Sequence, residues 1–231
     1  MSDADQHPDP VRDYYCASRS VGARDLTIYG IWEKGEAFND SVTPSTYVPA
    51  YRSHIVEKIL EVSDDGETVF SIGCGNGFVE ADLLGHGRAV RAMDYNDEAV
   101  ELTRSKGVDA FKADFFQLTP ADLAGVDVVY ADGLIGHLFD PRSQVAPALA
   151  KLTSLLWRPG IRLVFSNDSP FDPAAAFAPH PQVEGFWFVS KEYLAEQLVA
   201  YGFVPKETYY FPYERPLSGT RDRTIVVAVT P

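Results

Sequence analysis

The sequence has few cysteines, few basic residues for its acids, and no long apolar run. It contains 231 residues, of which two are cysteines, and 20 Lys or Arg stand against 33 Asp or Glu, giving a net charge of −13. Cys16 and Cys74 lie far apart and build no disulfide framework, so we expect a reducing, cytoplasmic location. No run of about 18 apolar residues predicts a membrane span. The opening residues lack the apolar core of a signal peptide.

The excess of acid also bears on the partners of the protein. Nucleic-acid-binding proteins usually carry a basic face, and no Lys/Arg cluster is visible here. An anionic membrane surface is disfavoured for the same reason. We therefore expect a small-molecule substrate, no nucleic acid and no membrane, with the chain acting as a monomer or homodimer.

Alternating strand and helix patterns predict an α/β fold. Strands alternating with helices are typical of a mostly parallel, doubly wound sheet with helices on both faces. The short connection between the last two strands predicts that they pair antiparallel. The expected strands are 68–73, 89–95, 108–114, 126–132, 161–167, 206–214 and 221–230. The expected helices are 47–62, 78–87, 96–107, 143–160 and 190–202.

We divide the chain into three parts: a disordered tail (1–10), an N-terminal extension (11–62) and a catalytic domain (63–231). The extension is rich in aromatic residues and reads as short helices and loops ending in a helix. It either closes over a bound ligand as a lid or packs against the sheet as a plain helical layer. The proline-rich stretch 170–188 predicts a loop beside the site.

The stretch TVFSIGCGNG, residues 68–77, places glycines at alternate positions after an apolar strand. Glycine weakens strands and helices, so Gly73, Gly75 and Gly77 indicate a tight turn or the close approach of a ligand. The turn lies between a strand and a helix, at the sheet edge where doubly wound folds bind ligands. An ordinary strand-to-helix turn is the alternative interpretation.

Two cofactor classes compete for this turn. A nicotinamide dinucleotide site has the spacing G-x-G-x-x-G, whereas here the third glycine position is Phe78. Asp94 ends the second strand, and an acid there can accept hydrogen bonds from ribose hydroxyls in either class. Asp114 ends the third strand and is followed by Phe115, a pair able to bind an adenine amino group and to cover its ring.

With these motifs in place, the chain resembles the class I S-adenosylmethionine-dependent methyltransferases over residues 55–231. The resemblance rests on VFSIGCGNG, AMDYN, KADFF, VDVVYADGLIGHL, WRPGIRLVFS and VSKEYLAEQLVAYGF, in this order and spacing. It implies a seven-stranded sheet whose last strand is antiparallel, and S-adenosylmethionine as cofactor. The cofactor-binding residues that it implies are Gly73, Gly75, Asp94, Tyr95, Asp114 and Phe115. To these we add as candidates Cys74 within the turn, Asp132 after the fourth strand and Tyr15 of the N-terminal extension.

One position departs from the family pattern. Members usually carry Asp or Glu two residues before the first glycine, and here that residue is Ser71. The acid helps to organise the methionine end of the cofactor. Either another acid compensates, with Asp132 as our candidate, or cofactor affinity is reduced, or activity is lost.

The resemblance places the chemistry after the fourth strand, in YADGLIGHLFD. We predict Asp132 and His137 as catalytic residues, His137 as a general base; a histidine packed against the sheet is the alternative. Tyr29, Trp32, His137 and Asp168 are predicted to bind substrate, although Asp168 also suits a turn or a helix cap. No histidine has partners at metal-ligand spacing, so we expect no metal.

The methyl acceptor is left open at this stage. The acids Glu33, Glu36, Asp40, Asp132 and Asp168 lie in segments able to line the pocket, which mildly favours N-methylation of an amine. O-methylation of a phenol or carboxylate is the alternative within enzymes. A protein of this fold that binds the cofactor without turnover is the alternative outside them.

Overall fold

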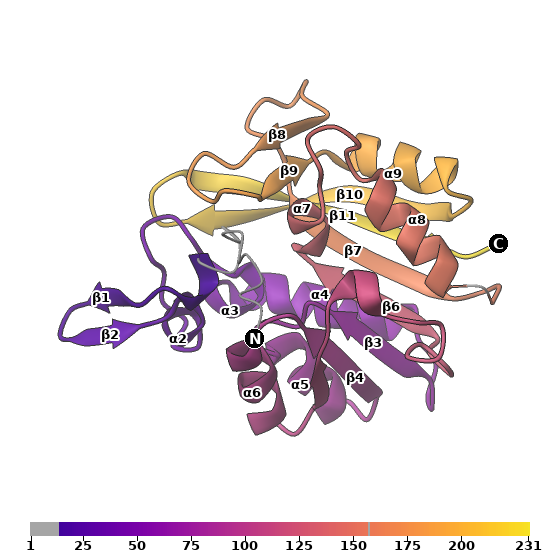
Figure 1. The fold of residues 1–231 in the computed structure, drawn as a ribbon, viewed down its shortest axis with the longest axis horizontal. Helices are drawn as coiled ribbons and strands as arrows, with labels where there is room; N and C mark the ends of the chain where they lie inside the picture. The colour runs from indigo at the N-terminus through magenta and orange to yellow at the C-terminus, as the bar shows by residue number, and fades with distance from the viewer. Residues whose placement is uncertain (1–13, 157) are drawn as a thin grey trace, which may run out of the picture.

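The computed structural model describes residues 14–156 and 158–231 and is built around one central sheet. Its strands are arranged in the order β10–β11–β7–β6–β3–β4–β5 (Figure 1). Their bounds are β3 (Thr68–Ile72), β4 (Ala89–Asp94), β5 (Asp109–Lys112), β6 (Val128–Asp132), β7 (Arg162–Asp168), β10 (Val204–Arg215) and β11 (Gly219–Val229). The predicted seven-stranded α/β fold is confirmed.

Strand direction follows the prediction as well. β3 pairs parallel with β4 and β6, and the β4–β5 and β6–β7 pairs are parallel too. β11 pairs antiparallel with both β10 and β7. The strand order reverses between β4 and β6, on the two sides of β3, so the carboxyl end of β3 is the place where a ligand site is expected.

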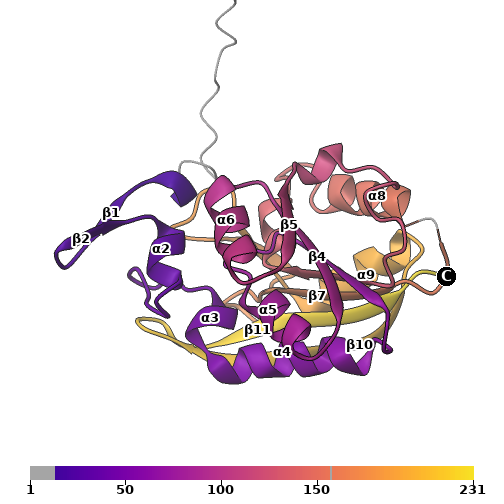
Figure 2. The same ribbon diagram turned by 90° about the horizontal axis from the view of Figure 1, so that it is seen from below.

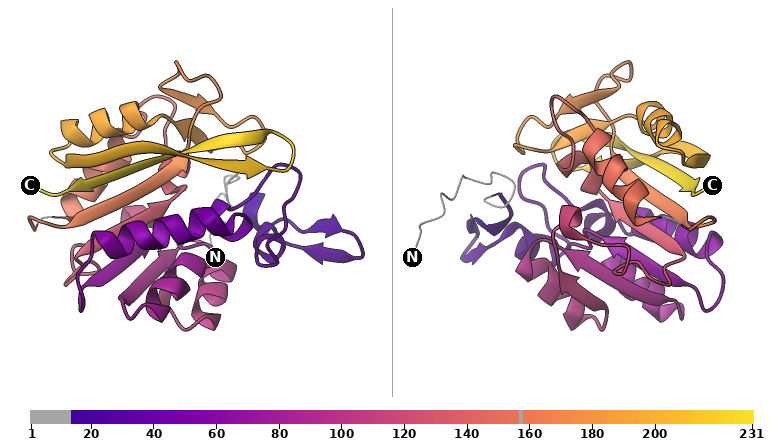
Figure 3. Two further views of the ribbon diagram at one scale, coloured as in Figure 1. Left: turned by 180° about the vertical axis from the view of Figure 1, so that it is seen from behind. Right: turned by 45° about the vertical axis from the view of Figure 1, so that its right-hand side comes forward.

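Helices cover both faces of the sheet, as their alternation with strands requires. Figure 1 shows α8 (Ala146–Leu155) and α9 (Lys191–Ala200) on one face, and the left view of Figure 3 shows α4 (Pro49–Glu61) on the other. α5 (Phe78–Gly85) and α6 (Asp97–Ser105) share the face of α4.

Side chains of the central strands alternate between the two hydrophobic cores. In β3, Phe70 and Ile72 pack toward α8 and α9, whereas Val69 packs toward α4 and α5. Strand side chains point to opposite faces in turn, so a strand covered on both faces is apolar throughout. The polar Ser71 in β3 is therefore conspicuous: it is 1% exposed and lies on the α5 side.

The N-terminal part contains more than the predicted helices and loops. Residues 14–16 are helical, and a hairpin of β1 (Arg19–Val21) and β2 (Arg24–Leu26) follows, which Figure 2 shows projecting at one end of the molecule. Val21 faces Arg24 across a two-residue turn in which Gly22 has φ +62°. Glycine at that position is a hairpin signal that the interpretation as helices and loops missed.

The rest of this part is helical. α2 (Ile28–Trp32) and α3 (Pro44–Tyr47) lead into α4. Thr27 caps α2 by accepting a hydrogen bond from the Gly30 N–H at 3.1 Å. The predicted disordered tail 1–10 lies outside the described residues. The three-part division of the chain stays a prediction.

The predicted loop 170–188 also carries a small hairpin. β8 (Phe177–Pro179) and β9 (Trp187–Val189) pair antiparallel within it. Phe177 and Trp187 pack on the core under α8 and α9, which anchors the hairpin although its sequence is rich in proline. Among the helices of residues 14–156 and 158–231, none has the length and apolar character needed to cross a membrane.

Candidate functional site

A cavity of about 460 Å³ lies at the carboxyl ends of the central strands. Pockets that bind small organic ligands are typically of this size. All of the site residues predicted from the sequence line it. They are Tyr15, Tyr29, Trp32, Gly73, Cys74, Gly75, Asp94, Tyr95, Asp114, Phe115, Asp132, His137 and Asp168.

The glycine turn follows β3 directly and forms one wall of the cavity. Gly73, Gly75 and Gly77 all have positive φ angles, of +78°, +54° and +73°. A Cβ atom on Gly75 would meet no other side chain closer than Tyr29 at 4.0 Å, so the space beside it is open. A Cβ atom on Gly77 would lie 2.5 Å from the hydroxyl oxygen of Thr103 in α6. Gly77 thus serves packing, whereas Gly75 leaves room for a ligand.

The backbone N–H groups of this turn are already used within the protein. Gly73 and Cys74 both donate to the carbonyl oxygen of Met93, at 2.8 and 3.0 Å, and Gly75 donates to Asp94. We therefore expect the turn to accommodate a cofactor by its lack of side chains, and less by donating hydrogen bonds.

Asp94 ends β4 and is nearly buried, at 8% exposure. One carboxylate oxygen accepts from the Gly75 N–H and the other from the Asn96 N–H, both at 2.9 Å. Burial raises the pKa of this carboxyl, and the two backbone donors partly offset that effect. The carboxylate is thus fixed at the cavity wall, and each of its oxygens retains acceptor capacity for a ribose hydroxyl.

Asp114 and Phe115 lie at the start of the turn η1 (Phe115–Gln117), which follows β5. The Asp114 side chain accepts from the Phe116 N–H at 2.8 Å and caps this turn. Phe115 is buried in the core, whereas Tyr95 is half exposed at the end of β4. An acid, a buried ring and an exposed ring thus border the same end of the cavity.

Ser71 has an acidic partner that the sequence interpretation missed. Its hydroxyl donates to Glu80 of α5 at 2.5 Å, and Glu80 is 2% exposed although it lines the cavity. Burial raises the pKa of Glu80 to about 7. The signal that could have identified Glu80 is its position on the buried face of the helix that follows the glycine turn. Asp132, our candidate for compensation, is instead paired with Arg223.

An aromatic cluster from the N-terminal part covers one side of the cavity. Tyr15 stacks on Tyr29 with ring centroids 5.2 Å apart, and it meets the edge of Trp32 at 5.9 Å. Its hydroxyl lies 2.7 Å from His137 Nε2, at the end of α7 (Leu134–His137). Tyr15 therefore joins the N-terminal part to the segment after β6.

His137 is a neutral side chain in this setting. Part of its surface faces the cavity and the ring of Phe186 at 4.7 Å, but Nδ1 is enclosed without a hydrogen-bond partner among the described residues. Desolvation lowers the pKa of His137 to about 4. His137 therefore does not titrate near neutral pH, where a general base is most effective.

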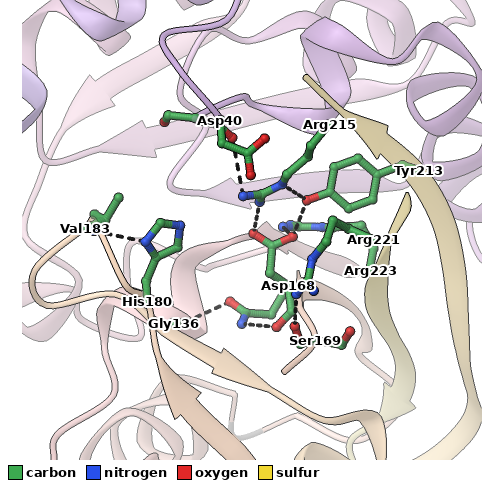
Figure 4. Close-up of polar contacts among 12 residues, drawn as sticks. Asp40, Gly136, Asp168, Ser169, His180, Val183, Tyr213, Arg215, Arg221 and Arg223 are labelled. Atoms are coloured by element: carbon green, nitrogen blue, oxygen red, sulfur yellow. Dashed lines mark hydrogen bonds and ion pairs between the residues drawn. The ribbon is translucent and has the colours of Figure 1, made fainter. Parts of the chain in front are cut away.

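A network of buried ions forms the far wall of the cavity, as Figure 4 shows. Asp168 accepts from Tyr213 and Arg215 at 2.5 Å each and pairs with Arg223 at 3.1 Å. These cations hold the pKa of Asp168 well below its usual range, although burial acts in the opposite direction. Asp168 is thus an ion-paired residue of β7 and not a turn or helix-cap aspartate.

The arginines come from the final strand pair, where no local sequence motif predicts that they line the cavity. Arg215 ends β10, and Arg223 lies within β11. His180 also lines this wall; its Nδ1 accepts from the backbone N–H groups of Gln182 and Val183, at 3.0 and 2.9 Å. Nε2 therefore carries the proton of the neutral ring. Sequence reasoning assigned no role to any of these side chains.

The acids behind the amine preference are less available than expected. Glu33 pairs with Lys106 at 2.6 Å, and Glu36 pairs with Arg24 at 3.0 Å. Asp40 accepts from the backbone N–H groups of Leu217 and Ser218. None of the three lines the cavity. Within the described part of the chain, no group of three or more His, Cys, Asp or Glu side chains is arranged to hold a metal ion.

Comparisons with known proteins agree with this geometry. A family model described as a methyltransferase domain matches residues 70–163. A tabtoxin biosynthesis enzyme of Pseudomonas amygdali pv. tabaci is 55% identical over 231 residues, which are all of this chain and 92% of the relative.

Two solved structures share the fold at low sequence identity. A magnesium protoporphyrin IX methyltransferase from Synechocystis PCC 6803, with bound S-adenosylmethionine, is 18% identical; the match covers 99% of this chain and all of that one, with a TM-score of 0.64. A glycopeptide N-methyltransferase complexed with S-adenosylmethionine is 15% identical, covering 78% and 94% of the two chains, with a TM-score of 0.59.

The glycine turn, the acid that ends β4 and the buried acid behind β3 together fit S-adenosylmethionine. Gly75 leaves open space at the wall, Asp94 offers acceptors for a ribose, and Glu80 offers an anion for an amino group. With the matching family model, the relative that covers the whole chain and the shared fold, these features lead to one conclusion. The chain belongs to the class I S-adenosylmethionine-dependent methyltransferases, which methylate their substrates with S-adenosylmethionine as donor.

Proposed function

We propose that the protein N-methylates an amine of a small molecule. When bound, S-adenosylmethionine supplies an electrophilic methyl group on a sulfonium sulfur. The relative named as a tabtoxin biosynthesis enzyme supports a substrate from the biosynthesis of a small toxin or a related metabolite. Gly73, Cys74, Gly75, Asp94, Tyr95, Asp114 and Phe115 are the residues that we propose to hold the cofactor.

The observation that carries the proposal is the effect of burial on the pKa values of side chains that line the cavity. Burial raises the pKa of Tyr29 far above its ordinary value and lowers that of His137 to about 4. Where no ion-pair partner is near, desolvation favours the neutral form of a group placed there. An amine becomes neutral and therefore nucleophilic in such a cavity, whereas a phenol stays protonated and unreactive. The environment thus favours an amine acceptor over a phenol.

Positioning is the main task left to the chain. Holding a nucleophile and a methyl group about 3 Å apart and aligned contributes roughly 7–11 kcal/mol. In the proposal, Tyr15, Tyr29 and Trp32 exclude water from the acceptor. Asp132 acts as a positioning residue, because it holds the Arg223 guanidinium at the wall.

His137 is the group that we propose to accept a hydrogen bond or proton from the acceptor. Its Nε2 lies within reach of the Tyr15 hydroxyl, so the same atom becomes available when Tyr15 yields its place to the acceptor. When the neutral amine attacks, an N–C bond would form as the methyl–sulfur bond of the sulfonium breaks, and the product would be an ammonium ion. Desolvation lowers the pKa of that ammonium, so a weak base such as His137 would be enough to accept its proton.

A second candidate function is O-methylation of a carboxylate. Arg215 lines the cavity, and among the described residues its Nη1 donates a hydrogen bond only to the Asp40 carbonyl oxygen, at 3.5 Å. A guanidinium edge with so weak a partner can bind an anionic group. A carboxylate acceptor also needs no base, which removes the demand on His137.

Labelled-methyl transfer distinguishes the two candidates. The protein is incubated with S-adenosylmethionine labelled in its methyl group and an extract of small metabolites, and labelled products are identified by mass spectrometry. N-methylation gives a label that resists alkali, whereas a methyl ester releases labelled methanol. Turnover of the cofactor with an alkali-labile product contradicts the amine proposal. Cofactor binding with no label transferred supports the non-catalytic alternative.

Variants of His137 test its proposed role once a substrate is known. We expect His137→Ala to lower kcat about 100-fold, at the low end of general-base effects, with cofactor affinity unchanged. Tyr15→Phe, which removes the hydroxyl partner but leaves the imidazole, is expected to lower kcat far less. If His137 only positions the substrate, KM rises more than kcat falls and His137→Asn recovers much of the loss. A normal kcat in His137→Ala contradicts the base.

A further inference from the structure

We propose that Glu80 replaces the acid missing from β3 and pairs with the ammonium group of the methionine moiety of the cofactor. The inference rests on the cofactor and does not depend on the identity of the methyl acceptor. Ser71 occupies the position where the family usually has Asp or Glu. The Ser71 hydroxyl points to the α5 side of the sheet and donates to Glu80 Oε1 at 2.5 Å. The serine therefore orients an acid that comes from the helix after the glycine turn.

Glu80 is an acid without a cation. It is 2% exposed, lines the cavity, and makes no ion pair within residues 14–156 and 158–231. A buried carboxylate is costly unless a positive group pairs with it. A carboxyl kept at such a place on a cavity wall is expected to meet a positively charged ligand group there.

The four other acids that line the cavity are already engaged, and among them Asp114 caps the turn η1 by accepting from the Phe116 N–H. Asp94 accepts from two backbone N–H groups, Asp132 pairs with Arg223, and Asp168 pairs with Arg215 and Arg223. Glu80 is left as a buried carboxyl of this wall that meets no cation within the part of the chain that the structure describes. The α-ammonium of the methionine moiety is a cationic group of the cofactor that could pair with this carboxyl.

The groups around Glu80 make its charge state sensitive to a ligand. Asp94 on β4 and Asp132 on β6 both oppose its ionisation, and Cys74 and Tyr130 are the other ionisable groups that it influences. Burial and these acids raise the pKa of Glu80 to about 7. An ammonium group beside it favours the carboxylate, so binding near pH 7 is expected to release a proton.

Binding measurements with two ligands test the proposal. The probes are S-adenosylhomocysteine, which carries the ammonium group but no sulfonium, and 5′-methylthioadenosine, which carries neither. We expect Glu80→Gln to weaken S-adenosylhomocysteine at least tenfold at pH 8 and to leave 5′-methylthioadenosine within twofold. Glu101→Gln, an exposed acid on α6, is the control and leaves both unchanged.

Calorimetry of the unaltered protein keeps the test decisive if Glu80→Gln does not fold. S-adenosylhomocysteine binding at pH 7, measured in two buffers of different ionisation heat, should release a fraction of a proton, and 5′-methylthioadenosine binding should release none. Equal release with both ligands, or none with either, overturns the proposal. In a folded Glu80→Gln, affinity for S-adenosylhomocysteine within twofold of the original, or an equal loss for both ligands, overturns it too.

Discussion

The Asp94 side chain both holds the glycine turn and borders the cavity, and this affects how its variants are interpreted. Its oxygens hold the Gly75 and Asn96 N–H groups, and the same oxygens border the cavity. Removal of the carboxylate is therefore expected to remove the proposed ribose contacts and also to loosen the glycine turn. Variants that keep the fold are needed to separate these effects.

We expect Asp94→Ala to weaken S-adenosylhomocysteine at least tenfold. A hydrogen bond to a charged group contributes about 1.5–3 kcal/mol, so the loss of a single ribose contact already reaches that factor. Titration calorimetry measures the change, and the melting temperature reports on the loosened turn. The control is Asp97→Ala on α6, an exposed acid paired with Lys112, which should leave Kd as it was. A Kd for Asp94→Ala that moves less than twofold means that the acid does not touch the ribose.

The residues of the site differ in how well their place in it can be predicted from the sequence. Asp94 and Asp114 each follow from the end of a predicted strand, and the alternation of strands and helices alone places both at one edge of the sheet. Glu80 was missed because an acid in a helix is normally read as a solvent-facing residue. The serine at position 71 was visible, but its partner depends on the packing of α5 against β3, which no local pattern encodes.

The secondary-structure elements that line the cavity also differ in how well their contribution can be predicted from the sequence. The predicted cofactor-binding residues after β3, β4 and β5 lie at strand ends and in the turns that follow them, so they can be inferred from the order of elements. The opposite half of the cavity takes Arg215 and Arg223 from β10 and β11, and His180 and Phe186 from the β8–β9 region. These segments meet through the antiparallel pairing of β11 with β7 and through side-chain hydrogen bonds from Asn167 to the Trp187 carbonyl and from Thr224 to the Val189 carbonyl. Their spacing in the chain carries no signature of these contacts.

The N-terminal elements are expected to act as a lid. Residues 14–16 are helical, and Tyr15 contacts Tyr29, Trp32 and His137 around the cavity. If cofactor binding completes this packing, amide hydrogen exchange in residues 14–40 slows when S-adenosylhomocysteine is added. Exchange in α9, on the far side of the sheet, serves as the reference. Unchanged exchange across residues 14–40 supports a plain packed layer instead.

At the scale of the whole molecule, buried titratable groups give stability two opposing dependences on pH. His137 and His180 have pKa values lowered to about 4 from 6.5, so their contribution is present above pH 6.5 and is lost as the pH falls toward 4. Glu80 has its pKa raised to about 7 from 4.5, so its contribution is present below pH 4.5 and is lost as the pH rises through 7. The two trends partly cancel between pH 4.5 and 7.

In the Glu80→Gln variant, we expect stability to follow the pH dependence of His137 and His180 without the opposing contribution of Glu80. Without the carboxyl, the free energy of unfolding of the variant, relative to the original protein, should rise by about 2 kcal/mol between pH 5 and pH 8. Urea unfolding of the ligand-free proteins at several pH values measures this difference. A difference that stays constant with pH shows that Glu80 does not titrate in this range.

The aromatic cluster that covers the cavity also provides an optical signal. The chain has three tryptophans, and Trp32 lines the cavity in T-shaped contact with Tyr15 and Tyr29. Trp187 is stacked on Phe139 with ring centroids 4.6 Å apart and does not line the cavity. A chain in which Trp157 and Trp187 are replaced by phenylalanine emits from a single indole beside the ligand. Its fluorescence then allows the arrival of the cofactor and the settling of the N-terminal residues to be timed separately by stopped flow.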